Sequence, residues 1–138
     1  MITLRALSAA DGPQVERLNL ETEGGFFLPE VATGAPQAKA WGLWKEDQLI
    51  GVVEVVGTGP VLWIARIGVD RAYRGLGYGY WALQQLLFEL GRRLRVQELR
   101  AAVHKDNHPA HRLFQKAGFQ PLGQADPVGE VVYVYRFR

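Results

Sequence analysis

The sequence contains no cysteine, and this absence excludes disulfide bonds, thiolate catalysis and cysteine-ligated zinc sites. It also lacks an uninterrupted apolar run of about 18 residues, the length that a membrane-spanning helix needs, so we expect no membrane partner. The N-terminus has neither the basic start nor the apolar block of a secretory signal peptide. The cytoplasm is therefore the expected compartment.

A recognisable metal-binding pattern is absent as well. His104, His108 and His111 lie close together, but no HExxH spacing or bridging carboxylate accompanies them, and we expect no metal.

Charge of one sign is not in excess, because 16 Lys and Arg residues face 14 Asp and Glu residues and the formal net charge is +2. A nucleic-acid-binding domain usually carries a denser basic face, so we expect no nucleic-acid partner. The nearest candidate for such a face is the group Arg92, Arg93, Arg95 and Arg100, of which the first three lie at the end of an expected helix. Cations are favoured there by the helix dipole.

The spacing of apolar residues predicts a mixed sheet covered by helices. The expected order is β-α-loop-β-β-β-α-β-α-β-β, which fits a single domain over residues 1–138. Strands are expected at 2–7, 39–45, 48–57, 61–69, 98–104 and 130–138, with helices at 8–21, after the glycines to Leu94, and at 108–117. Residues 22–37 show no period and are rich in Gly and Pro, which is typical of a loop.

Alternate glycines occur where the strand 61–69 leads into the longest expected helix. The segment reads Arg74-Gly-Leu-Gly-Tyr-Gly79. The start of a helix has unpaired backbone N–H groups and a partial positive charge, and glycines let a bulky anion approach them without a Cβ in the way. Arg71 and Arg74 add positive charge beside these groups. The pattern therefore indicates a phosphate-binding turn.

Known phosphate motifs narrow the interpretation. A Walker loop needs Gly-Lys-Ser/Thr, which is absent, and a dinucleotide fingerprint counted from Gly75 has Tyr80 in place of its third glycine. The spacing that fits is Arg74-x-x-Gly77-x-Gly79. Taken alone, such a glycine cluster is equally compatible with a turn that binds no ligand.

Two motifs together give the chain its resemblance to a family. The segments IGVDRAYRGLGYG (67–79) and AAVHKDNHPAHRLFQKAGF (101–119) resemble the two signatures of the GNAT superfamily of acetyl-CoA-dependent N-acetyltransferases. The resemblance implies an α/β fold (mixed α+β) with a mostly antiparallel sheet of six to seven strands. It further implies helices on both faces of the sheet and a splay, that is, a widening gap, between the fourth and fifth strands.

The resemblance also implies how acetyl-CoA, the co-substrate, is bound. Backbone groups of the strand 61–69 would pair with the pantetheine amides like an added strand, and backbone amides of the glycine turn would hold the pyrophosphate. Asn107 would reach the pantetheine end, and Phe114 would lie against it. The implied cofactor-binding residues are Ile67, Gly68, Val69, Arg74, Gly75, Leu76, Gly77, Tyr78, Gly79, Asn107 and Phe114.

The residues that serve as acid and base in many members of the family are missing from this sequence. Many members carry a tyrosine where this chain has Phe114, and a carboxylate on one of the splayed strands, where this chain has none. Glu54, an acid among apolar residues, and His104, at the end of a splayed strand, are the candidate catalytic residues. Phe26, Phe27 and Trp41 are the candidate walls of the acceptor pocket.

The expected activity is transfer of the acetyl group to a primary amine of a small molecule or peptide by direct attack on the thioester. The alternatives are a non-catalytic acyl-CoA-binding module and, third, a nucleic-acid-binding domain. A homodimer is compatible with each of these hypotheses. The sequence names no particular acceptor.

Overall fold

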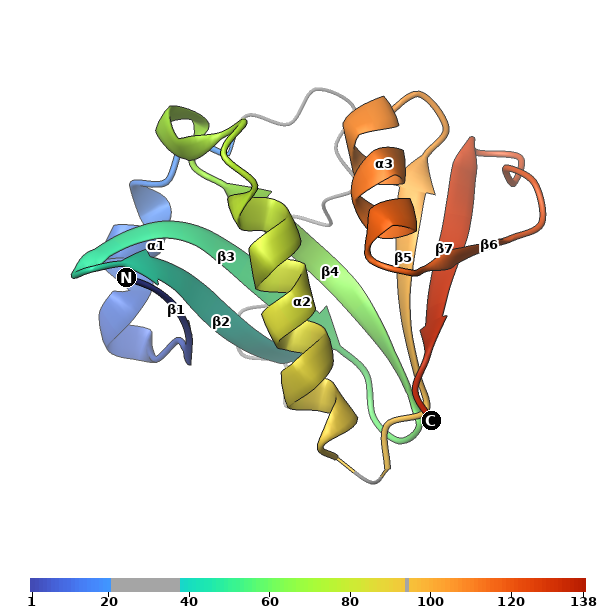
Figure 1. The fold of residues 1–138 in the computed structure, drawn as a ribbon, viewed down its shortest axis with the longest axis horizontal. Coiled ribbons are helices and arrows are strands. Elements are labelled where there is room, and N and C mark those ends of the chain that lie inside the picture. The colour runs from blue at the N-terminus through green and yellow to red at the C-terminus, as the bar shows by residue number, and fades with distance from the viewer. Residues whose placement is uncertain (21–37, 94) are drawn as a thin grey trace.

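The computed structural model describes residues 1–20, 38–93 and 95–138. These residues form one seven-stranded sheet with the strand order β1-β2-β3-β4-β5-β7-β6 (Figure 1). Every neighbouring pair is antiparallel except β4 and β5, which are parallel. The strands are β1 (Ile2–Ala6), β2 (Ala38–Lys45), β3 (Gln48–Val56), β4 (Val61–Val69), β5 (Glu98–His104), β6 (Gln120–Leu122) and β7 (Glu130–Arg136).

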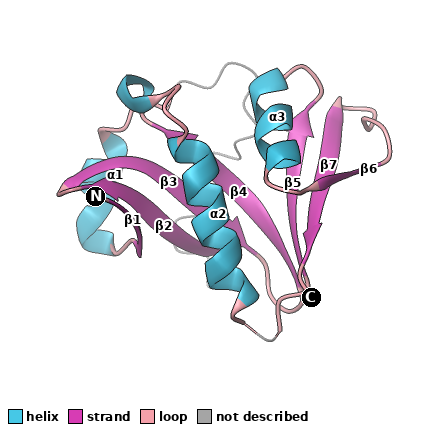
Figure 2. Cartoon of the chain, in the orientation of Figure 1, coloured by secondary structure: helices cyan, strands magenta, loops and turns pink. Residues whose placement is uncertain are grey.

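Helices lie on both faces of this sheet. The α-helices are α1 (Gly12–Glu16), α2 (Tyr78–Gly91) and α3 (His108–Lys116), and single 3-10 turns occupy Ala9–Asp11 and Arg71–Tyr73. In Figures 1 and 2, α2 and α3 lie in front of the sheet and α1 lies behind it. The element order and the fold class predicted from the sequence are both confirmed. Within the described residues, no helix has the length and apolar character needed to cross a membrane.

The core forms where the predicted periods bring apolar side chains together. Leu83, Leu86 and Leu90 of α2 are fully buried, because a spacing of three or four residues keeps them on one helix face. On β5, Leu99, Ala101 and Val103 are fully buried, as expected for alternate residues of a strand with one covered face. Leu94, the last residue of the helix expected from the sequence, lies outside the described residues.

The helix predicted over residues 8–21 is wrong in its length. Pro13 lies in the first turn of α1, as its fixed φ and missing N–H allow, but the helix ends at Glu16. Beyond it, the N–H of Asn19 donates to the Asp70 carboxylate at 2.8 Å, and the Asn19 carbonyl accepts from the N–H of Arg71 at 2.9 Å. These contacts use the backbone groups of Asn19 outside a helix and attach the segment to the turn before α2.

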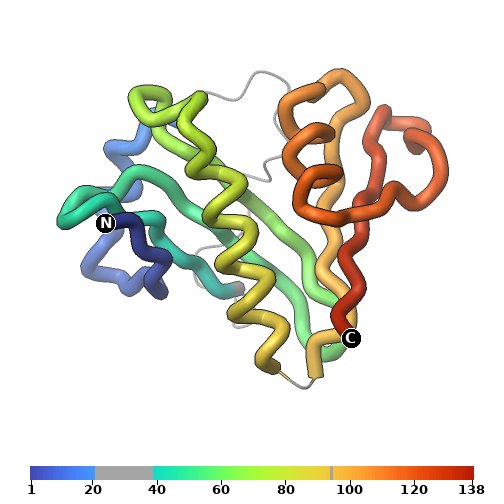
Figure 3. Tube along the Cα trace, viewed as in Figure 1, coloured from blue at the N-terminus to red at the C-terminus, as the bar shows by residue number. Residues whose placement is uncertain are grey.

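The predicted splay between β4 and β5 is present. Their pairing covers only Val61–Trp63 of β4 against Glu98–Arg100 of β5. From Ile64 onward, β4 pairs with β3 alone and β5 continues with β7. Figure 3 shows the two traces diverging toward the end of the sheet where α2 begins. One edge of β4 therefore has no partner strand within the described chain, next to the glycine turn.

Candidate functional site

Contacts within residues 69–74 fix the approach to α2. Asp70 caps the 3-10 turn by accepting the N–H of Ala72 at 2.9 Å, and it also accepts from Asn19. Arg74 is extended, and its Nε donates to the carbonyl of Val69 at 3.1 Å. The residues that lead into the glycine turn (residues 74–79) are thus held in place by hydrogen bonds before any ligand arrives.

Gly75 and Gly77 need to be glycine because of their backbone conformation. Their φ angles are +78° and +82°, in the left-handed region that other residues rarely adopt. A Cβ built on either residue would meet no atom within 4 Å, so neither glycine is required for packing against the protein. The space beside both residues is open to a ligand.

Backbone amides without a partner in the described chain lie beside this open space. The first helical hydrogen bond of α2 joins the N–H of Trp81 to the carbonyl of Gly77 at 3.0 Å. The N–H groups of residues 76–80 donate to no acceptor in the described part of the chain, and Gly77, the N-cap, has no side chain with which to cap them. Because α2 is 14 residues long, its dipole adds a partial positive charge there. The glycine turn therefore fits a pyrophosphate group.

The start of α3 lies across the splay from β4 in Figure 1. Asn107 is the N-cap of α3, and its side chain accepts the N–H of Ala110 at 3.3 Å. Phe114 is fully buried, with its ring 5.1 Å from that of Phe119 and stacked at 6.0 Å on that of Tyr133. Core packing accounts for Phe114 as it stands, and the cofactor roles of both Asn107 and Phe114 stay predictions.

The structure separates the two candidate catalytic residues onto different strands. Glu54, on β3, is buried and forms an ion pair with Arg66, its cross-strand partner on β4. His104, at the end of β5, accepts the backbone N–H of Asp106 on its Nδ1 at 3.1 Å. No hydrogen bond or ion pair joins Glu54 to His104 among the described residues. Neither role is tested by this arrangement, and both stay predictions.

Arg66 was missed in the sequence. It lies in the splayed part of β4, and its buried Nε has no hydrogen-bond partner among the described residues. The pairing of Glu54 with Arg66 depends on a β-bulge between Glu54 and Val55, which shifts the register of β3 against β4. No pattern in the sequence marks that bulge, so alternation alone gives no reliable cross-strand partner for Glu54.

The acceptor wall is only partly described. Phe26 and Phe27 lie outside the described residues. Trp41, on β2, is 7% exposed and belongs to the core cluster, with the guanidinium of Arg93 5.9 Å from its ring centre. Its ring offers little surface to a substrate in this arrangement, and its assignment to the acceptor pocket stays a prediction.

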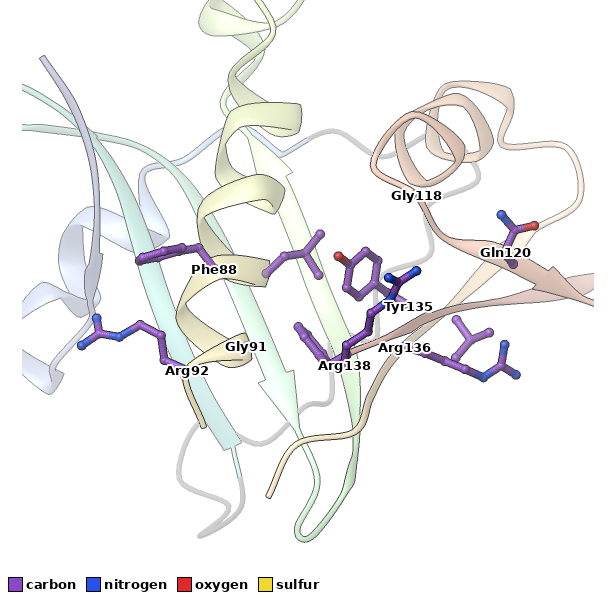
Figure 4. A pocket seen from close by; sticks show the side chains of 11 residues that line it. Phe88, Gly91, Arg92, Gly118, Gln120, Tyr135, Arg136 and Arg138 are labelled. Carbon is purple, nitrogen blue, oxygen red and sulfur yellow. The ribbon is translucent and has the colours of Figure 1, made fainter. Parts of the chain in front are cut away.

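A cavity of about 660 Å³ lies at the other end of α2, between that helix and β7 (Figure 4). We call it the β7 cavity. Residues of α2, β6 and β7 line it, together with Gly118 and the residues after β7. The side chains of Arg92 and Arg136 extend from it in opposite directions, whereas the ring of Tyr135 points into it. These two arginines therefore point away from each other, while Arg138, the third arginine of the lining, lies beside Tyr135.

The sequence profile of the acetyltransferase (GNAT) family matches residues 6–119. A probable spermine N(1)-acetyltransferase of Bacillus subtilis subsp. natto (strain BEST195) is 30% identical over 105 residues, which cover 70% of this chain and 68% of the relative. The spermine/spermidine N(1)-acetyltransferase of Bacillus subtilis (strain 168) matches with the same identity and coverage. The chain belongs to the GNAT family.

Solved structures agree with this fold. The PaiA N-acetyltransferase from Thermoplasma acidophilum, in complex with coenzyme A, superposes with a TM-score of 0.81 at 17% identity and covers 99% of both chains. The ribosomal-protein-S18-alanine N-acetyltransferase from Escherichia coli superposes with a TM-score of 0.76 at 19% identity, covering 97% of this chain and 91% of that chain.

The family membership identifies the class of enzyme. The protein is an N-acetyltransferase that uses acetyl-CoA as its co-substrate, so the resemblance, the activity and the co-substrate inferred from the sequence are confirmed. A non-catalytic acyl-CoA-binding module is accordingly set aside. The individual cofactor-binding residues are a separate matter, and they stay predictions supported by the geometry of the glycine turn.

Proposed function

We propose that the acceptor is a primary amine of a small molecule or peptide, which attacks acetyl-CoA directly in the splay between β4 and β5. The observation that carries this proposal is the juxtaposition of the open glycine turn with the unpaired edge of β4 from Ile64 onward. The glycine turn would hold the pyrophosphate end of acetyl-CoA, and the open edge of β4 next to it would receive the pantetheine arm.

The expected binding mode follows from these two features. The pyrophosphate lies on the amides of residues 76–80, and the pantetheine amides pair with the backbone of Ile67 and Val69 as an added strand. Asn107 and Phe114, on α3, form the opposite wall. The acetyl group then lies further along the splay, beyond Ile67 and toward the point where β4 and β5 converge.

The reaction needs a neutral amine. Its nitrogen attacks the thioester carbonyl, the C–S bond breaks, CoA leaves as a thiolate and the nitrogen loses a proton. With a pKa of about 10.4, only about 1 in 2,500 alkyl amines is neutral at pH 7, against about 1 in 6 for an α-amine with a pKa near 7.7. An alkyl amine therefore depends far more on a base than an α-amine does.

Glu54 and His104 are proposed as the base for this proton transfer, and each already has a partner in the structure. Glu54 is held by Arg66, and the Nδ1 of His104 is used by the turn after β5. Phe114 has no proton to give, so the thiolate (thiol pKa about 8.5) leaves with protonation from water. If Glu54 is the base, Glu54→Gln lowers kcat/KM by about 10²-fold or more, whereas His104→Gln does not. The reverse result assigns the role to His104.

A polyamine is the first acceptor to test, because two curated relatives are named for acetylation of spermine or spermidine. A polyamine carries several positive charges, whereas the carboxylate of Glu54 is already paired with Arg66. Peptide amines are therefore included as the second class.

The experiment has two arms. Isothermal titration measures acetyl-CoA binding, and release of the CoA thiol is followed with spermine, spermidine and peptides whose only free amine is either the α-amine or a lysine side chain. We expect micromolar to millimolar cofactor binding and thiol release above hydrolysis with at least one amine. Binding without release for every amine would overturn the proposed acceptor class.

A further inference from the structure

A buried tyrosine of β7 joins three elements next to the splay. The hydroxyl of Tyr133, a residue that is 2% exposed, lies 2.6 Å from the Nδ1 of His111 and 3.2 Å from the amide nitrogen of Gln115. The Nε2 of His111 lies 3.0 Å from the carbonyl oxygen of His104. These four residues, which we call the Tyr133 network, connect β7 to α3 and to the end of β5.

The chemistry of the groups fixes the direction of each hydrogen bond. The His104 carbonyl can only accept, so the Nε2 of His111 carries the hydrogen and donates it. When the ring is neutral, its Nδ1 is an acceptor and receives the hydroxyl hydrogen of Tyr133. The Gln115 amide nitrogen donates to the oxygen of the same hydroxyl. Each donor and acceptor of the Tyr133 network thus has one consistent role.

The network reaches both residues of α3 that are assigned to the cofactor. The His104 carbonyl that accepts from His111 also accepts the backbone N–H of Asn107 at 2.9 Å. The ring of Tyr133 is stacked on that of Phe114, at a centroid distance of 6.0 Å and an interplanar angle of 21°. Tyr133 therefore contacts Phe114 directly and is connected to Asn107 through His111 and a single carbonyl.

Packing does not explain the hydroxyl. Tyr135, two residues further along β7, packs its ring against Phe119 at 5.5 Å and Phe137 at 5.1 Å. The hydroxyl of Tyr135 makes no hydrogen bond within the described chain. A phenylalanine at 133 would supply the same aromatic surface, so the hydroxyl adds only the connection to α3.

We propose that Tyr133 is a positioning residue for acetyl-CoA, which holds the start of α3 at the distance from β4 that the pantetheine arm requires. The proposal rests on the assignment of Asn107 and Phe114 to the cofactor. Without the hydroxyl, the Nδ1 of His111 loses this partner, and no hydrogen bond among the described residues then joins α3 to β7. No hydrogen bond among the described residues joins the Tyr133 network to the glycine turn, so we expect the turn to keep its conformation.

The test compares Tyr133→Phe with Tyr135→Phe, a matched control on the same strand. Calorimetry gives the Kd for acetyl-CoA, and displacement of acetyl-CoA gives the Kd for ADP, a probe that carries the pyrophosphate without the pantetheine. For Tyr133→Phe we expect an acetyl-CoA Kd about five- to tenfold higher and an ADP Kd within about twofold of the wild type. Tyr135→Phe should leave both values within about twofold.

The ratio of the two Kd values separates positioning from general damage. A merely structural role would raise both values together or lower only the unfolding midpoint, and either result overturns the proposal, as does an equal effect of Tyr135→Phe. If Tyr133→Phe does not fold, Gln115→Leu removes the other hydrogen bond of the hydroxyl and should raise the acetyl-CoA Kd alone by about two- to threefold; an unchanged value overturns the proposal. A wild-type protein that binds no acetyl-CoA refutes the cofactor assignment instead.

Discussion

The two ends of α2 both border open space, but only the N-terminal end has backbone N–H groups without an acceptor in the described chain. There, the amides of residues 76–80 adjoin Gly75 and Gly77, where a Cβ would meet no atom within 4 Å. At the other end, the β7 cavity of about 660 Å³ has arginines that point in opposite directions (Figure 4). We expect the ligand at the N-terminal end, because unpaired backbone donors at the start of a helix favour an anion, whereas volume alone favours none.

The helix itself explains the difference. Its backbone presents free N–H groups at the start and free carbonyls at the end, so an anion is favoured only at the start. The cations at the end are partly compensated already: Arg92 and Arg93 lie 3.8 Å from the Glu89 carboxylate. Arg100, the last of the arginines considered as a nucleic-acid surface, is paired with Glu98 at 2.7 Å.

The largest effect is expected for Gly77→Val. A β-branched side chain opposes a φ of +82° and fills the space that a phosphate oxygen would occupy. We expect the acetyl-CoA Kd, measured by calorimetry, to rise by more than about 100-fold. The expected cost in stability is about 1–3 kcal/mol, measured by denaturant unfolding.

Gly59→Val is the matched control for that variant. Gly59 has a φ of +79° and nothing within 4 Å of its Cβ position, but it lies in the turn between β3 and β4. It should lose similar stability and keep its acetyl-CoA affinity. Equal losses of affinity in the two variants would mean that strain, rather than a blocked phosphate site, explains Gly77→Val.

A smaller effect is expected for Arg74→Ala. The guanidinium is positioned by its bond to the Val69 carbonyl, and one charge-assisted contact contributes about 1–2 kcal/mol, so the acetyl-CoA Kd should rise about tenfold. The same titration, repeated at higher salt, should reduce the difference between wild type and variant. If Arg74→Ala binds more weakly than a folded Gly77→Val, side-chain charge rather than backbone amides dominates the capture of the pyrophosphate.

The features that could be predicted from the sequence are those that depend on nearby residues. The leucine spacing of α2, the alternation of β5 and the glycine turn each depend on residues within one short segment. The structure contains all three. The sequence predicts a first helix that is too long, because the residues that hold Asn19 outside a helix, Asp70 and Arg71, lie far along the chain from it.

The same limit applies to the site. Arg66 opposite Glu54 depends on a bulge, and the hydrogen bond of Tyr133 to His111 depends on how α3 packs over β7. His111, one turn before Phe114, and Tyr133, in an alternating strand, do not by themselves indicate a hydrogen bond between them. The family resemblance implied the cofactor and the splay, but its two signatures specify neither a cross-strand partner for Glu54 nor a hydrogen bond for Tyr133.

The smallest effect is expected at the β7 cavity, for the double variant Arg92→Ala, Arg136→Ala. Both arginines are largely exposed, and each has a carboxylate partner 3.8 Å away, Glu89 for the first and Glu98 for the second. Such surface pairs contribute at most about 1 kcal/mol each, so unfolding should change little and the acetyl-CoA Kd should stay within about twofold.

This double variant also tests the comparison between the two ends of α2 as a whole. It removes two positive charges, one more than Arg74→Ala removes, at a distance from the glycine turn. If the local amides and Arg74 hold the cofactor, charge removed at the β7 cavity has almost no influence, because exposed charges are screened beyond about 10 Å at 0.1 M salt. A rise in the acetyl-CoA Kd as large as that of Arg74→Ala would contradict this. The net positive field of the protein, rather than the convergence of groups at one end of a helix, would then hold the cofactor.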